Sequence, residues 1–138
     1  MIVLDENTIQ ERIIVALARW YKGQVCTLRD LRPHTIIKDD AIPALLARAP
    51  QPTFVTTNLT DFWQKAVADN RYCIVCLPLP NERQHEIPNL LRCLLREPLF
   101  KTKAMRMGKV ARVSMTGVQF YQVGHRTIET ILWKPPQR

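Results

Sequence analysis

Residues 53–62 read TFVTTNLTDF, and this stretch predicts the fold. Thr53–Thr56 contains an apolar, β-favouring pair and reads as a short buried strand, which the polar residues after it end. Either Asn58 or Thr60 then serves as the N-cap of a helix that carries Asp61 in its first turn. A strand, a polar turn and a helix in this order are typical of α/β folds, in which ligands bind at the carboxyl ends of the strands.

The beginning of the chain has the same form. Residues 2–4 read as an apolar strand, and the acidic residues Asp5 and Glu6 follow at its end. A Thr-x-x-Glu capping box then opens a helix predicted over 8–21. Two such strands side by side would bring Asp5 and Asp61 together. The alternative is that each Asp only stabilises the N-terminus of its own helix.

The rest of the chain continues this alternation. Further strands are predicted over 24–28 and 71–77, further helices over 39–49, 60–69 and 86–97, and a polar connection over 29–38. From Gly108 the pattern changes, and residues 110–115 and 118–123 predict a hairpin. Residues 128–133 fit either another strand or a short helix. We therefore expect a single-domain α/β fold with a central parallel sheet flanked by helices and a C-terminal β-hairpin.

Length and composition limit the class of protein. A chain of 138 residues with 46% hydrophobic residues suits one domain with a substantial core. It has no run of the roughly 18 apolar residues that a membrane span requires. The N-terminus lacks the basic segment and cleavage site of a signal peptide, so we expect a cytoplasmic protein without a membrane partner.

The four cysteines do not indicate a zinc or redox site. Cys73 and Cys76 form a Cys-x-x-Cys pair, but they lie within the predicted strand 71–77, where residues three apart point to opposite faces. A structural zinc site requires four ligands, and no second close pair exists. We interpret these residues as buried free thiols. The three histidines match no metal spacing and are interpreted as surface or loop residues: His34, His85 and His125.

The net charge of +8 is distributed unevenly. Residues 1–82 hold nine basic and nine acidic residues, whereas residues 83–138 hold eleven basic and three acidic residues. A basic region of this kind indicates a polyanionic partner such as nucleic acid, although it is also compatible with an ordinary solvated face. The strongest cluster, which we take as the candidate RNA-binding surface, contains Lys101, Lys103, Arg106, Lys109 and Arg112.

A third acidic element precedes the strand at 53–56. Asp39 and Asp40 begin the predicted helix 39–49, and the right-handed crossover of a βαβ unit would bring them near Asp5. Clustered carboxylates repel one another, and a hard divalent cation such as Mg²⁺ or Mn²⁺ relieves that repulsion. A carboxylate-held metal beside a basic surface is suited to phosphodiester hydrolysis.

The acidic motifs resemble the metal-site motifs of PIN-domain proteins. The resemblance rests on Asp5-Glu6-Asn7 after a strand, Asp39-x-x-Ile42 at the start of a helix, and Thr57-Asn58-x-x-Asp61-Phe62. PIN-domain proteins are Mg²⁺- or Mn²⁺-dependent ribonucleases, and many are toxins of bacterial toxin–antitoxin pairs, the VapC type. The short spacing from Asp5 to Asp39 is similar to that of the compact PIN-like subgroup. The resemblance covers residues 1–80.

The resemblance implies roles for particular residues. Asp5, Asp39 and Asp61 would be the metal ligands and catalytic carboxylates, with Glu6 and Asp40 as further candidate ligands. Thr57 and Asn58 would orient the carboxylates or the attacking water, or would serve only in helix capping. The implied cofactor is Mg²⁺ or Mn²⁺, and the implied partners are RNA and an antitoxin protein. Formation of a homodimer is left open.

The implied organisation is one PIN-like domain over 1–133. Its α/β core with the acidic site would occupy 1–80, a basic helix and hairpin would extend it over 81–133, and 134–138 would form a tail. One feature departs from the family pattern. PIN sites usually include another acid between the first and third motifs, and the candidate substitutes here are Asp30 and Glu6.

Three other classes of function were weighed against this one. A catalytically weak or inactive PIN-like protein that binds RNA or another protein is the main alternative, because the acidic set departs from the family pattern. A phosphotransfer protein of the haloacid dehalogenase type requires Asp-x-Asp, and Asn7 occupies that position. The receiver type requires a Lys after a late strand, which is missing after Leu77. A dinucleotide-binding fold is excluded because no Gly-rich loop follows the first strand.

Overall fold

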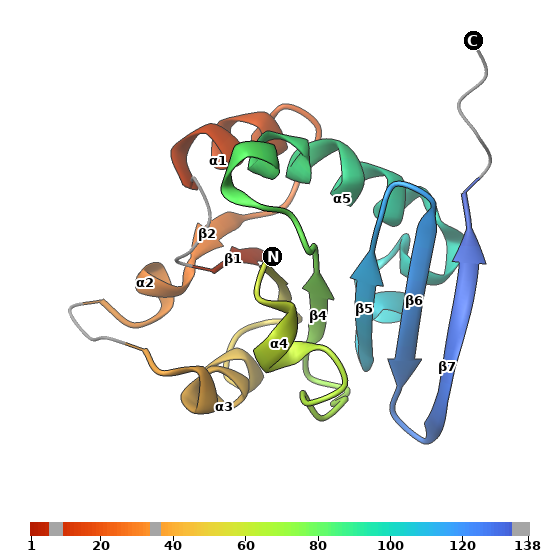
Figure 1. Ribbon diagram of the computed structural model, residues 1–138. Coiled ribbons are helices and arrows are strands. Elements are labelled where there is room, and N and C mark those ends of the chain that lie inside the picture. Colours follow the sequence, from red (N-terminus) through yellow and green to blue (C-terminus); the bar gives the residue numbers. More distant parts are fainter. Residues whose placement is uncertain (6–9, 34–36, 134–138) are drawn as a thin grey trace, which may run out of the picture.

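The computed structural model describes residues 1–5, 10–33 and 37–133, and it shows an α/β architecture (Figure 1). Seven strands form one mixed sheet in the order β2-β1-β3-β4-β5-β6-β7. The strands are β1 (Ile2–Leu4), β2 (Val25–Thr27), β3 (Thr53–Thr56), β4 (Cys73–Cys76), β5 (Lys109–Val113), β6 (Gly117–Gln122) and β7 (His125–Leu132). The helices are α1 (Gln10–Ala18), α2 (Leu28–Leu31), α3 (Ile42–Ala47), α4 (Leu59–Phe62), α5 (Ile87–Arg96) and α6 (Lys103–Arg106), with 3₁₀ turns η1 (Asp39–Ala41), η2 (Asn81–Glu86) and η3 (Pro98–Phe100).

The first five strands of the sheet run parallel to one another. β1 lies between β2 and β3, and its Leu4 is in register with Thr27 of β2 and Val55 of β3. β3 pairs in parallel with β4, and β4 with β5. All five strands therefore end at the same side of the sheet. We call this side the carboxyl edge, and the side where these strands begin the amino edge.

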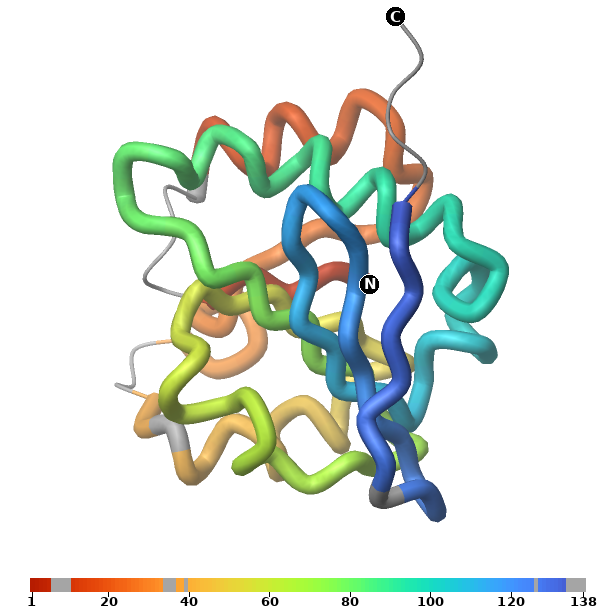
Figure 2. The backbone as a smooth tube through the Cα atoms, turned by 45° about the vertical axis from the view of Figure 1, so that its right-hand side comes forward, coloured from red at the N-terminus to blue at the C-terminus, as the bar shows by residue number. Residues whose placement is uncertain are grey.

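Helices cover both faces of the sheet, so the core has two halves. On one face α1 and α5 lie side by side, as Figure 2 shows, and their apolar side chains pack on Ile2, Leu4 and Val55. On the other face the residues of α2, α3 and α4 pack on Val3, Phe54 and Ile74. The central strands β1, β3 and β4 are buried on both faces because each face carries a layer of helices.

The helix α5 lies within the range predicted for it, 86–97, and packs its apolar side chains on the sheet. Ile87, Leu90, Leu91 and Leu94 are buried against the sheet, and Leu95 is half-buried. Pro88 lies in the first turn, where its missing N–H would have no helical partner. Leu91 is fully buried, so its replacement by Ala is expected to cost about 2–5 kcal/mol of stability.

Two predicted helices are shorter than expected. The helix predicted over 60–69 is only the single turn α4, because Trp63 adopts an extended backbone and Gln64 has a positive φ of 62°. Asn58, rather than Thr60, is its N-cap. The helix predicted over 39–49 begins as the 3₁₀ turn η1 and continues as α3. The start predicted for the first helix, at residues 8–9, lies outside the described residues.

The region predicted as a polar connection over 29–38 contains the short helix α2. The Thr27 backbone N–H donates to the Asp30 carboxylate at 2.8 Å, which caps this turn. The C-terminal hairpin is present in part. β5 and β6 pair antiparallel, but β5 also joins the parallel sheet and β7 extends the antiparallel portion. Residues 128–133, left open between strand and helix, fall mainly in β7.

The thiols of β4 are buried on opposite faces of the sheet, as predicted. Cys73 packs in the half of the core that contains α1 and α5, and Cys76 packs in the other half. Burial raises the pKa of both thiols to about 12. Cys26 is also buried, whereas Cys93 is exposed. No helix in the described part of the chain is long and apolar enough to cross a membrane.

Candidate functional site

The predicted pairing of β1 with β3 brings Asp5 next to Thr56. Asp5 extends the ladder by one residue, since its backbone N–H donates to the Val55 carbonyl at 3.0 Å. Its side chain is only 5% exposed. The Thr56 hydroxyl, which is fully buried, donates to Asp5 Oδ2 at 2.7 Å. A buried polar group requires a partner, and this bond also fixes the orientation of the carboxylate.

The same hydroxyl is connected to Asp61 through Asn58. The Asn58 backbone N–H donates to Thr56 Oγ1 at 3.0 Å, so that oxygen accepts one bond and donates another. The Asn58 side-chain amide donates to Asp61 Oδ2 at 2.6 Å, and the Asp61 backbone N–H donates to Asn58 Oδ1 at 3.1 Å. A continuous chain of hydrogen bonds therefore runs from Asp5 through Thr56 and Asn58 to Asp61.

This arrangement follows from local sequence. Phe54 and Val55 hold β3 in the buried sheet, so Thr56 must point its hydroxyl into the carboxyl edge next to β1. Asn58 is an N-cap whose amide reaches two groups at once, the backbone and the carboxylate of Asp61. One carboxylate is buried and the other is exposed to solvent, which suits a ligand that sits at the surface and reaches inward.

The remaining predicted site residues are only partly described. Asp39 begins η1, but its side chain, like all of Glu6, lies outside the described part of the chain. Asp40 is exposed in the same turn. Thr57 is half-buried and takes no part in the chain of hydrogen bonds. Asp30, a candidate substitute for the missing acid, accepts bonds from the backbone and hydroxyl of Thr27 and so has a structural role.

The donor set can be tested against a metal ion. Among the described residues no group of three His, Cys, Asp or Glu side chains lies close enough to hold one. That search covers Asp5 and Asp61, but neither Glu6 nor the side chain of Asp39. The atoms of this chain of hydrogen bonds that could coordinate a metal are carboxylate, hydroxyl and amide oxygens. This chemistry fits Mg²⁺ or Mn²⁺ and does not fit a soft metal.

The five predicted RNA-binding cations do not form one face next to this edge. Arg106 and Lys109 are buried, with exposed fractions of 3% and 7%, because both donate to carbonyl groups within the fold. Lys101 and Lys103 are exposed but lie with them at the amino edge, on the elements that precede β5. Arg112 is half-buried on β5, beside Gln119 of β6. The prediction of a single basic face adjoining the acidic residues is therefore wrong.

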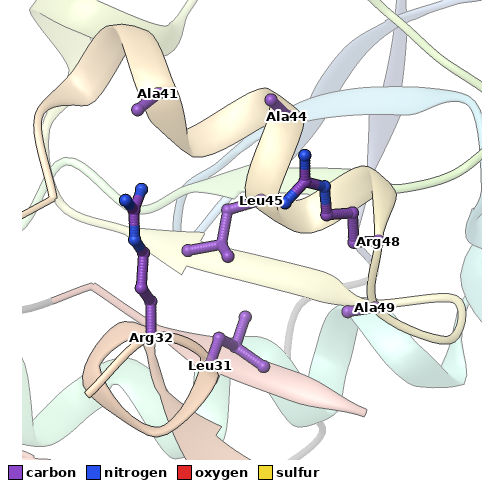
Figure 3. Close-up of a pocket in the computed structure, with 7 residues that line it drawn as sticks. All are labelled: Leu31, Arg32, Ala41, Ala44, Leu45, Arg48 and Ala49. Atoms are coloured by element: carbon purple, nitrogen blue, oxygen red, sulfur yellow. The ribbon is translucent and has the colours of Figure 1, made fainter.

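A different pair of cations lines a groove in the helical layer. A groove of about 520 Å³ runs between α2 and α3, and Arg32 and Arg48 line it together with Leu31 and Leu45. Figure 3 shows the two guanidinium groups extending from the two elements, with Leu45 between them. Neither arginine forms an ion pair with a residue that the structure describes. The groove adjoins Ala41, the last residue of the η1 turn that carries Asp39 and Asp40.

The chain matches no protein-family model, no curated protein and no solved structure. Sequence reasoning singled out Asp5, Asn58 and Asp61 but assigned no role to Thr56, which joins them. The signal for Thr56 was available, because a Thr that ends a strand beside an Asp-ending strand faces the same edge of the sheet. No sequence pattern of this kind marks Arg32 and Arg48, because neither lies at the end of a strand.

Proposed function

We propose that this chain is a Mg²⁺- or Mn²⁺-dependent ribonuclease of PIN type and the toxin of a toxin–antitoxin pair. The observation that supports the proposal best is the chain of hydrogen bonds that links Asp5 to Asp61 at the carboxyl edge. Carboxylates held in fixed positions by hydrogen-bond donors of the fold are what a hydrolytic metal site requires. The resemblance of the three acidic motifs to PIN domains supplies the substrate class.

The residues of the edge have distinct roles in this proposal. Asp5 and Asp61 hold the metal with Asp39, and the hydroxyl of Thr56 fixes Asp5 while the amide of Asn58 fixes Asp61. A bound Mg²⁺ or Mn²⁺ supplies a water of lowered pKa and stabilises negative charge on the phosphoryl oxygens. Because the supporting hydrogen bonds are formed within the fold itself, the carboxylates require little reorganisation when the substrate binds.

The RNA strand is positioned by Arg32 and Arg48 in this proposal. Their groove adjoins the acidic turn η1, and a guanidinium group binds phosphate through two parallel hydrogen bonds. The apolar side chains of Leu31 and Leu45 between them offer a surface for a base or ribose. Phosphate contacts of this kind position a strand without reading its sequence, so cleavage of single-stranded RNA with low sequence preference is expected.

The proposal is tested by incubating the protein with single-stranded RNA. Cleavage is expected with Mg²⁺ or Mn²⁺, and excess EDTA should stop it. Asp5→Asn and Asp61→Asn should each abolish cleavage, because the amide keeps the shape of the side chain but removes the charge. Glu129→Gln is the matched control, since Glu129 is an exposed acid on β7. Cleavage that persists in EDTA or in both Asp variants would contradict the proposal.

The same experiment also distinguishes the alternative, a PIN-like protein that binds RNA without cleaving it. A protein that binds RNA equally well in the wild type and in Asp5→Asn, and cleaves it under no metal condition, would be a PIN-like RNA-binding protein. The toxin assignment is checked in cells. Expression of the wild type should arrest growth, and expression of Asp5→Asn to the same level should not. Growth arrest by both proteins would contradict a toxin that acts through RNA cleavage.

A further inference from the structure

Arg106 is a buried cation without a carboxylate partner in the described part of the chain. Its side chain is 3% exposed, and Nε donates to the Thr53 hydroxyl at 3.1 Å. Nη1 donates to the carbonyls of Phe100 and Lys101 at 3.0 Å and 3.2 Å. All these acceptors are neutral. The side-chain ion pairs of the described residues join Arg71 to Asp69 and Arg83 to Glu86.

Lys109, the first residue of β5, is a second buried cation of this kind. It is 7% exposed and donates to the Met105 carbonyl, and its ammonium lies 5.7 Å from the centroid of the Phe100 ring. Glu129 attracts this ammonium electrostatically but forms no ion pair with it. Burying a cation costs free energy unless an opposite charge compensates it. The amino edge therefore holds two buried cations, neither of which forms an ion pair with a described residue.

Arg106 also lines a shallow pocket that carries further cations. The pocket has a volume of about 400 Å³ and is lined by Lys22, Lys101, Lys103 and Arg106, together with Tyr21, Gly23 and Leu95. None of the described residues that line it is acidic. The Met1 amino group donates to the Tyr21 hydroxyl at 3.1 Å, which leaves the hydroxyl proton of Tyr21 available to a ligand. The pKa of that amino group is lowered by burial and then by the charges of Lys103 and Arg106.

We propose that this pocket at the amino edge binds the phosphate group of a nucleotide or of an RNA strand. Arg106 offers a guanidinium that three internal hydrogen bonds hold in one orientation, so little conformational entropy is lost when an oxyanion binds to it. The three exposed lysines supply mobile charges that close over the anion. A volume of about 400 Å³ is in the range of small-ligand sites.

This site is separate from the proposed metal centre. The pocket lies where the parallel strands begin, and the chain of hydrogen bonds from Asp5 to Asp61 lies where they end. The inference goes beyond the proposed ribonuclease activity and does not depend on it. Phosphate should bind in EDTA, and it should bind to Asp5→Asn as well as to the wild type.

The experiment measures binding at low ionic strength in EDTA by calorimetry, with inorganic phosphate, 5′-AMP and a short single-stranded RNA as the probes. The test variant is Lys101→Ala/Lys103→Ala, because both side chains are exposed and their loss should leave the fold intact. Loss of two charged donors should weaken binding by about tenfold or more. The control with the same net charge is Arg12→Ala/Lys65→Ala, which removes two exposed cations outside the pocket and should bind like the wild type.

The three probes distinguish the source of the phosphate. Binding of inorganic phosphate and 5′-AMP that the test variant loses indicates a site for a phosphate monoester. Binding of the RNA alone, with a salt dependence that becomes shallower in the test variant, indicates a site for the backbone of a strand. Arg106→Lys keeps the charge but loses the planar fork, and it should weaken the same probe. If the test variant and the control bind every probe equally, or if no probe binds the wild type saturably, the proposal is wrong.

Discussion

Thr56 and Asp5 are joined by a hydrogen bond of 2.7 Å between hydroxyl and carboxylate, across two neighbouring parallel strands. Both side chains are buried, and the same hydroxyl accepts the Asn58 backbone N–H. The buried carboxylate is therefore oriented by a residue that also sets the start of α4, the helical turn that carries Asp61. A substitution of Thr56 should therefore alter the orientation of both carboxylates, Asp5 and Asp61.

We expect Thr56→Val to lower RNA cleavage by about 10- to 100-fold, which is the usual effect of removing a residue that orients a metal ligand. Valine has nearly the shape of threonine but cannot donate to Asp5 or accept from Asn58. The measurement is cleavage as a function of Mg²⁺ concentration, in which the variant should require more metal. Thr57→Val is the control, since Thr57 takes no part in the chain of hydrogen bonds. Equal losses in the two variants would point to a general effect on folding.

The choice between Asp39 and Asp40 is also testable. Asp39→Asn should abolish cleavage, and Asp40→Asn should change it by a small factor, because the Asp-x-x-Ile spacing selects Asp39. The double variant Asp5→Asn/Asp61→Asn should lose no more activity than either single variant, since residues that hold one metal act as a unit. Single-turnover cleavage rates provide the comparison. Severe loss in Asp40→Asn with near-normal Asp39→Asn would move the assignment by one residue.

The groove between α2 and α3 predicts a salt dependence. Arg32→Ala/Arg48→Ala should weaken RNA binding and reduce the slope of log affinity against log salt by about 1 to 2, because two phosphate contacts are lost. Binding is measured in EDTA so that cleavage does not interfere. Arg19→Ala/Arg96→Ala removes the same charge from two exposed positions outside this groove and should leave the slope close to that of the wild type.

The buried thiols predict how stability depends on pH. The pKa of Cys73 and Cys76 rises from its ordinary value near 9 to about 12 in the folded protein, because burial opposes the thiolate. Their contribution to stability is fully present below about pH 9 and is lost as pH rises towards 12. Denaturant unfolding at several alkaline pH values should show this decline. It should be smaller in Cys76→Ala and unchanged in Cys93→Ala, since Cys93 is exposed; a decline of equal size in all three proteins would contradict the explanation.

Most of the parallel sheet could be predicted from sequence because its strands are continuous apolar runs. Residues 53–56 form β3 with the predicted bounds, and the pairing of β1 with β3 is as expected. The helix after β3 was predicted too long, since its apolar spacing continues while Gln64 turns the backbone to a positive φ. Hydrophobic periodicity does not predict tertiary contacts. One example is the contact between the rings of Trp63 and Tyr121, whose centroids are 5.4 Å apart.

The residues of the candidate site that could be predicted are those whose position follows from the strand before them. Asp5 directly follows β1, and Asn58 and Asp61 lie at the start of the helix after β3, so their place at the carboxyl edge follows from the alternation of strands and helices. The basic residues were not predictable in the same way. Arg106 and Lys109 lie in a run of cations that reads as a solvated surface, but their long side chains fold inward to the carbonyls of Phe100 and Met105.

The charges at the two ends of the parallel strands form a local electric dipole along the strand direction. Lys22, Lys101 and Lys103 lie at the amino edge, and Asp5 and Asp61 lie at the carboxyl edge. A polyanion attracts these lysines and repels these carboxylates, so we expect its first encounter to favour the amino edge. The carboxyl edge then faces outward, towards a second strand or a looped segment of the same strand. Salt would slow this encounter by screening the dipole, even where no contact in the final complex changes.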